Sequence, residues 1–193
     1  MAGTARAQEV RGTKAKRPAT IEDLYKVRGQ AEIVGGRIIR MSPTGFHPAR
    51  AAHAICASLR QYEQKTRRGY AMPDNAAYIV DLPNRRSFGP DASFYVGPPT
   101  GGKFMEGAPL FAAEVRSEGD YGPVAEREMA NKRADYFAAG TLIVWDVDLL
   151  SHEPVKSYPA DDPDNPRIFH RHEIADAEPA VPGWRFRVDE LFE

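Results

Sequence analysis

The stretch FGPDASFYVG, residues 88–97, decides the fold because it places an acid directly before a run of aromatic, β-branched and small residues. A second stretch, PLFAAEVRS at residues 109–117, has an acid at the far end of a similar run. The two runs predict neighbouring strands. If these strands form an antiparallel hairpin, their acids, Asp91 and Glu114, stand at the ends that meet.

The spacing of the two runs predicts the register of this hairpin. The connecting loop is centred between Gly102 and Lys103, so the numbers of opposed residues should add up to 205, as those of Asp91 and Glu114 do. Directly opposed residues project from one face, with β-carbons about 4.5–5.5 Å apart. Alternation along both strands assigns the other face to Ala92, Phe94, Val96, Phe111, Ala113 and Val115.

Two carboxylates this close need a compensating positive charge in a partly buried site. A hard divalent cation such as Mg²⁺ supplies it, because Mg²⁺ binds a few carboxylate oxygens together with water. The alternative is that each acid is a solvated strand end or pairs with Arg85, Arg86 or Arg116.

Patterns elsewhere in the chain predict helices on either side of a sheet. Thr20 and Asp23 are spaced as a capping box, and Gly35-Gly36 joins two β-type runs as a tight hairpin would. Residues 48–69 and 123–139 are expected to be helices, and the apolar run at 141–147, which includes Trp145, a buried strand. This order predicts an α/β (α+β) fold with a mixed central β-sheet flanked by helices.

Length and composition limit the class of protein. The 193 residues fit one domain, and 42% hydrophobic with 27% charged residues is typical of a globular chain. We expect a single domain over residues 20–193, and a disordered leader over residues 1–19, whose five Lys or Arg residues could alternatively contact phosphates. No secretory or membrane-spanning run is present, so we expect a cytoplasmic protein with no membrane partner.

The order of these motifs resembles the PD-(D/E)xK nuclease superfamily, and within it the Uma-type restriction-endonuclease-like family. Pro90-Asp91 and Glu114-Val115-Arg116 match the superfamily motif. The longer matches are GGRIIRMSPTGF, GAPLFAAEVRS, KRADYFAAGTLIVWDVD and VPGWRFRVDELF. The resemblance implies a restriction-endonuclease-like core and makes Asp91 and Glu114 metal ligands.

The resemblance also implies roles for three further residues. Glu32 matches an acid before the glycine turn and would be another active-site carboxylate, although a strand-edge glutamate fits the sequence equally well. Lys132 matches a lysine that stands in for the usual superfamily lysine, whose position Arg116 occupies here. Arginine keeps its proton, so Arg116 would serve as an electrostatic group only. The alternative for Lys132 is a surface pair with Glu128.

The expected function is therefore hydrolysis of phosphodiester bonds by a Mg²⁺-dependent endonuclease, with Mn²⁺ as an alternative metal and DNA as the partner. Homodimerisation would suit the cutting of both strands of a duplex. The competing hypothesis is a catalytically inactive protein with the nuclease fold that acts as a nucleic-acid-binding or interaction module. A third is hydrolysis of another phosphate ester.

Overall fold

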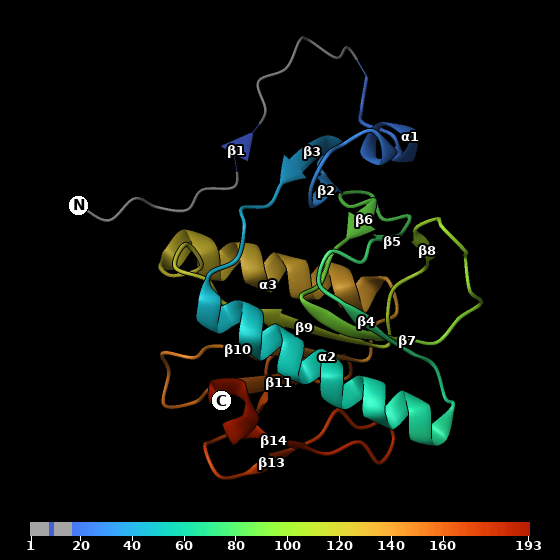
Figure 1. Ribbon diagram of the computed structural model, residues 1–193. Coiled ribbons are helices and arrows are strands. Elements are labelled where there is room, and N and C mark those ends of the chain that lie inside the picture. The colour runs from blue at the N-terminus through green and yellow to red at the C-terminus, as the bar shows by residue number, and fades with distance from the viewer. Residues whose placement is uncertain (1–7, 10–16) are drawn as a thin grey trace.

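The computed structural model describes residues 8–9 and 17–193. Its centre is a mixed six-stranded sheet in the order β12-β11-β10-β9-β7-β4 (Figure 1). The strands are β4 (Tyr70–Pro73), β7 (Ala92–Tyr95), β9 (Phe111–Val115), β10 (Ile143–Val147), β11 (Val155–Pro159) and β12 (Arg167–Phe169). This architecture confirms the predicted fold class.

The central pair of strands has the register expected from the sequence. Strands β7 and β9 are antiparallel, with Ala92 opposite Ala113 and Phe94 opposite Phe111. Asp91 lies one residue before β7, and its backbone N–H donates to the carbonyl of Ala113 at 3.1 Å. When this register is continued by one residue, Asp91 falls opposite Glu114, near the C-terminal end of β9.

Helices α2 (Phe46–Thr66) and α3 (Pro123–Ala138) cover opposite faces of this sheet (Figure 1). The buried stripe of α2 packs on the face that carries Phe111 and Trp145, which confirms Trp145 as a core residue. Tyr136 of α3 packs on the other face, against Ala112 and Val144. Helix α3 connects β9 to the parallel strand β10, so Glu114 lies beside Asp146 and both belong to the α3 face.

Two local predictions were wrong. Helix α2 ends at Thr66 and not at Gly69, because Arg67 adopts the left-handed conformation and donates its N–H to the carbonyl of Glu63 at 2.8 Å. Val96, expected to continue the strand on the face of Ala92 and Phe94, lies beyond the end of β7 at Tyr95 and is 52% exposed.

The N-terminal part forms a separate layer above α3 (Figure 1). Helix α1 (Ile21–Tyr25) begins with the predicted capping box, and the hairpin of β2 (Ala31–Val34) and β3 (Arg37–Arg40) turns at Gly35-Gly36, both with positive φ. The short strand β1 (Gln8–Glu9) pairs with β3. Most of the expected leader over residues 1–19 lies outside the described residues.

The remaining segments enclose the sheet. Strands β5 (Tyr78–Ile79), β6 (Ser87–Phe88) and β8 (Met105–Glu106) form a small sheet beside the hairpin, and β8 arises within the predicted β7–β9 loop. At the C-terminus, β13 (Ile174–Ala175), β14 (Phe186–Arg187) and the 3₁₀ helix η1 (Val188–Phe192) complete the core on the α2 face. Across residues 8–9 and 17–193, no helix has the length and hydropathy that crossing a membrane requires.

Candidate active site

The site is built on the end of the β7–β9 pair. Asp91 is fixed there by two backbone contacts: its own N–H bonds to β9, and its Oδ2 accepts the N–H of Val115 at 2.6 Å. Glu114 projects from β9 toward α3, where it accepts hydrogen bonds from two α3 side chains. The predicted approach of the two acids at one end of the hairpin therefore has a defined geometry.

Both carboxyl groups are held in an environment that disfavours their charged forms. Burial, reinforced by the charge of Glu114, raises the pKa of Asp91 to about 8. Burial also raises the pKa of Glu114, with a further contribution from Glu32, although Lys132 opposes the rise. The two acids thus lack sufficient positive charge nearby when both are ionised.

Lys132 reaches the site from the middle of α3. Its Nζ donates to Glu114 Oε2 at 2.7 Å and lies 3.1 Å from Glu32 Oε1. Burial alone would lower the pKa of Lys132, but the Glu114 and Glu32 carboxylates outweigh it and raise that pKa. Lys132 is therefore an ammonium shared by two carboxylates, in place of the surface pair with Glu128 that was the alternative.

Glu32 lies on β2 and is only 1% exposed. Its Oε1 accepts the N–H of Gly89 at 2.9 Å as well as the contact from Lys132, and its Oε2 accepts from Arg85. Burial opposes ionisation of Glu32, but Lys132 and Arg85 outweigh it and lower its pKa. Glu32 is thus an ionised carboxylate that binds both Lys132 and Arg85.

Three side chains that sequence reasoning did not assign to the site complete it. Tyr136 donates its hydroxyl to Glu114 Oε1 at 2.7 Å, and Arg85 donates its Nε to Asp135 Oδ2 at 2.8 Å. Tyr136 and Asp135 follow Lys132 on α3 by four and three residues, a spacing that puts them on one helical face and could have identified them. Arg85 lies in an irregular segment between β5 and β6, where no periodicity indicates its direction.

The charges at this site do not balance. Four carboxylates gather around two cations, a group that we call the acid-rich cluster: Glu32, Asp91, Glu114 and Asp135 with Arg85 and Lys132. A divalent cation would neutralise the excess. Within the described residues there is no group of three or more His, Cys, Asp or Glu arranged to hold a metal. Two carboxylates completed by water fit Mg²⁺, which commonly binds in this way.

Arg116 belongs to a neighbouring group of charges. It makes two hydrogen bonds to Asp146, at 2.7 and 2.8 Å, and further ones to Glu126 at the start of α3, while Arg133 lies 3.5 Å from Asp146. We call these four residues the balanced cluster, since two arginines face two acids. The other contacts of the Arg116 guanidinium, with the Asp120 carbonyl and the Tyr121 ring, lie in the loop beside this cluster. The structure therefore does not bring Arg116 to Asp91 and Glu114.

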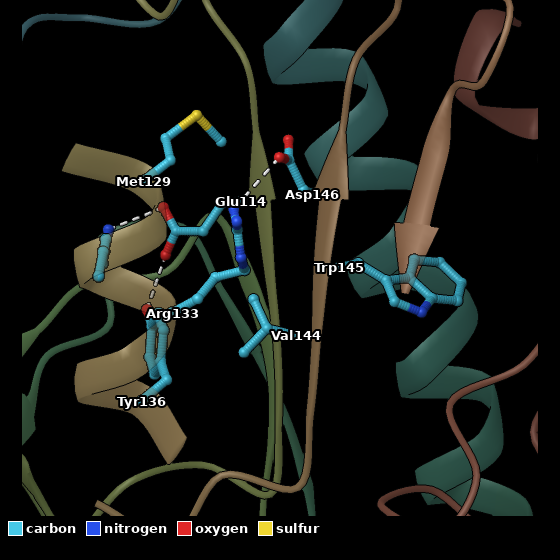
Figure 2. Close-up of a pocket in the computed structure, with 8 residues that line it drawn as sticks. Glu114, Met129, Arg133, Tyr136, Val144, Trp145 and Asp146 are labelled. Carbon is cyan, nitrogen blue, oxygen red and sulfur yellow. Dashed lines mark hydrogen bonds and ion pairs between the residues drawn. The ribbon is translucent and has the colours of Figure 1, made fainter. Parts of the chain in front are cut away.

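A small pocket between α3 and the sheet connects the two clusters. Figure 2 shows Glu114 and Tyr136 facing one another, with Asp146 nearby on β10 and Trp145 directed to the opposite face. The lining also includes Met129, Lys132, Arg133 and Val144. Glu114 therefore lines a pocket whose wall also carries the ammonium group of Lys132 and the guanidinium group of Arg133.

Comparisons with known proteins agree with this architecture. Residues 19–189 match the model of the Uma2 family, described as putative restriction endonuclease. A crystal structure of a putative nuclease belonging to DUF820 from Anabaena variabilis ATCC 29413 superposes with a TM-score of 0.70 at 16% sequence identity. The match covers 91% of this chain and 98% of that one, and at this identity it shows a shared fold. No curated protein matches the chain.

Proposed function

Because the chain belongs to the Uma2 family of putative restriction endonucleases, and is thus a nuclease-like protein, we propose that it is a Mg²⁺-dependent endonuclease of DNA. The observation that carries this proposal is the pair Asp91 and Glu114, whose pKa values are both raised at the end of one antiparallel strand pair. Such a pair favours a bound dication over two free carboxylates.

The proposed roles follow from the contacts of each side chain. Asp91 and Glu114 would hold the metal, which would polarise the phosphate and lower the pKa of a bound water. Lys132 keeps its proton between two carboxylates, so it acts as a fixed positive charge and not as a base. That charge stabilises the negative charge that develops on the phosphate during hydrolysis.

Calorimetry with Mg²⁺ and Mn²⁺ tests this proposal, with wild-type protein and Asp91→Asn compared, followed by nicking of supercoiled plasmid by the same samples. We expect wild type to bind metal and nick the plasmid, and the variant to do neither. Asparagine keeps the size of the side chain and removes its charge. Competition by RNA and by nucleotides then separates DNA hydrolysis from action on another phosphate ester.

A non-catalytic nucleic-acid-binding module is the second candidate, and one observation favours it. Both oxygens of Glu114 already accept hydrogen bonds from Lys132 and Tyr136, so a metal must compete with these donors. Binding of DNA by wild-type protein without metal-dependent nicking would support this second function and exclude the first.

A further inference from the structure

Arg85 is the most enclosed cation at the site. It is 6% exposed, and its guanidinium carbon lies 5.0 Å from the centre of the Phe88 ring. Its backbone forms an isolated bridge with Val34 of β2. Arg85 donates Nη1 to Glu32 and Nε to Asp135, so it joins the N-terminal hairpin to the helix that carries Lys132.

Arg85 competes with Lys132 for one carboxylate. Glu32 divides its charge between the two cations, and the Lys132 ammonium lies closer to Glu114, at 2.7 Å, than to Glu32, at 3.1 Å. The Arg85 guanidinium repels the Lys132 ammonium, so it reduces the net attraction of Lys132 toward Glu32. Without Arg85, Lys132 would be the one cation left at Glu32 within residues 8–9 and 17–193.

We infer that Arg85 is a positioning residue that keeps the Lys132 ammonium beside Glu114 and prevents its capture by Glu32, an inference that rests on the proposed function. Asp135 lies about one helical turn after Lys132 on α3 and accepts a hydrogen bond from Nε of Arg85. This second contact holds the Arg85 guanidinium in place. A guanidinium suits the task since its fork of donors reaches two carboxylates at once, which a lysine ammonium does less well.

Loss of Arg85 should move metal binding and turnover in opposite directions. Arg85→Met removes one positive charge from the acid-rich cluster and lets Lys132 move toward Glu32. Glu114 then loses its competing cation, so Mn²⁺ should bind about tenfold more tightly. Turnover at saturating Mn²⁺ should fall about tenfold, because the ammonium has left the reacting phosphate. A residue that only supports the fold would weaken both when removed.

The experiment combines calorimetry with Mn²⁺ alone, plasmid nicking at saturating Mn²⁺ and a crystal structure of metal-free Arg85→Met. Tighter binding with slower turnover supports the inference, and equal or weaker binding overturns it. Arg116→Met is the matched control for affinity, since it removes the same charge from a similarly buried site in the balanced cluster. It should change the Mn²⁺ affinity less than twofold.

The crystal structure decides the inference independently of the metal. We expect Lys132 Nζ closer to Glu32 than to Glu114 in the variant, and an unchanged contact with Glu114 would overturn the inference. If wild type binds no Mn²⁺, the proposed function fails, while this structural comparison still gives an answer for Arg85. Should Arg85→Met not fold, Arg85→Lys replaces it, with a smaller shift of Lys132 and a smaller gain in affinity expected.

Discussion

Glu114 and Asp146 are direct neighbours on the parallel strands β9 and β10, and both belong to the face covered by α3. Their electrostatic surroundings differ. Asp146 is 2% exposed and faces Arg116 and Arg133, so its charge is fully matched. Glu114 shares Lys132 with Glu32 and stands near Asp91, so acids exceed cations around it. Similar acids at equivalent positions thus belong to a structural ion pair in one case and to a potential metal site in the other.

The largest effect expected from this difference is on catalysis. Glu114→Gln removes a proposed metal ligand while keeping the side-chain size, so plasmid nicking should fall about 10³-fold, a loss of several kcal/mol of transition-state stabilisation. Calorimetry should show the loss of Mg²⁺ binding. Asp146→Asn is the matched variant, and Mg²⁺ binding retained in Asp146→Asn but not in Glu114→Gln would establish the contrast.

Replacement of Lys132 should have the second-largest effect. Lys132→Met should slow nicking about 10²-fold at saturating Mg²⁺, because one preorganised charge beside the phosphate is lost. Metal affinity should stay the same or rise, since the competing ammonium has gone. Lys132→Arg keeps the charge and should recover part of the rate. Equal rates for Lys132→Met and wild type would remove Lys132 from the mechanism.

Asp146→Asn should affect folding more than the site. Removal of one partner from a buried ion pair leaves Arg116 without its main acceptor, which should cost about 3 kcal/mol of unfolding free energy. Urea denaturation in the absence of metal measures this loss. Glu114→Gln should lose less, because Lys132 keeps Glu32 as a partner and burial already disfavours the charged form of Glu114, as its raised pKa indicates. The reverse order would contradict the division into acid-rich and balanced clusters.

The last expected effect is a pH dependence of stability in the metal-free protein. The pKa of Asp91 is about 8 in the folded chain and near the ordinary value of 3.8 when unfolded, so the folded state binds the proton more tightly. Its contribution to stability should therefore decline as pH rises from about 4 to about 8. Denaturation in EDTA between pH 5 and pH 9 should show a smaller decline for Asp91→Asn, and identical slopes would argue against the burial of this charge.

Local patterns predicted much of the fold correctly. The capping box at Thr20, the glycine turn at Gly35-Gly36 and the apolar stripe of α2 depend on residues close together in the chain. The β7–β9 register also followed from loop symmetry, even though β8 occupies part of that loop. The end of α2 could not be read in this way, because Arg67 adopts a conformation for which glycine is the usual choice.

The sequence by itself determined that Asp91 and Glu114 meet, since alternation and hairpin register bring them to one end of one strand pair. Only the tertiary structure decided which cations meet them. Arg85, Arg116 and Lys132 have long side chains, and the acids that they meet in the two clusters lie 10 to 100 residues away. Docking of α3 and the N-terminal hairpin on the sheet directs Arg85 and Lys132 to the acid-rich cluster and Arg116 to Asp146. Pairing at such sequence separations depends on how whole elements pack, which short-range periodicity does not encode.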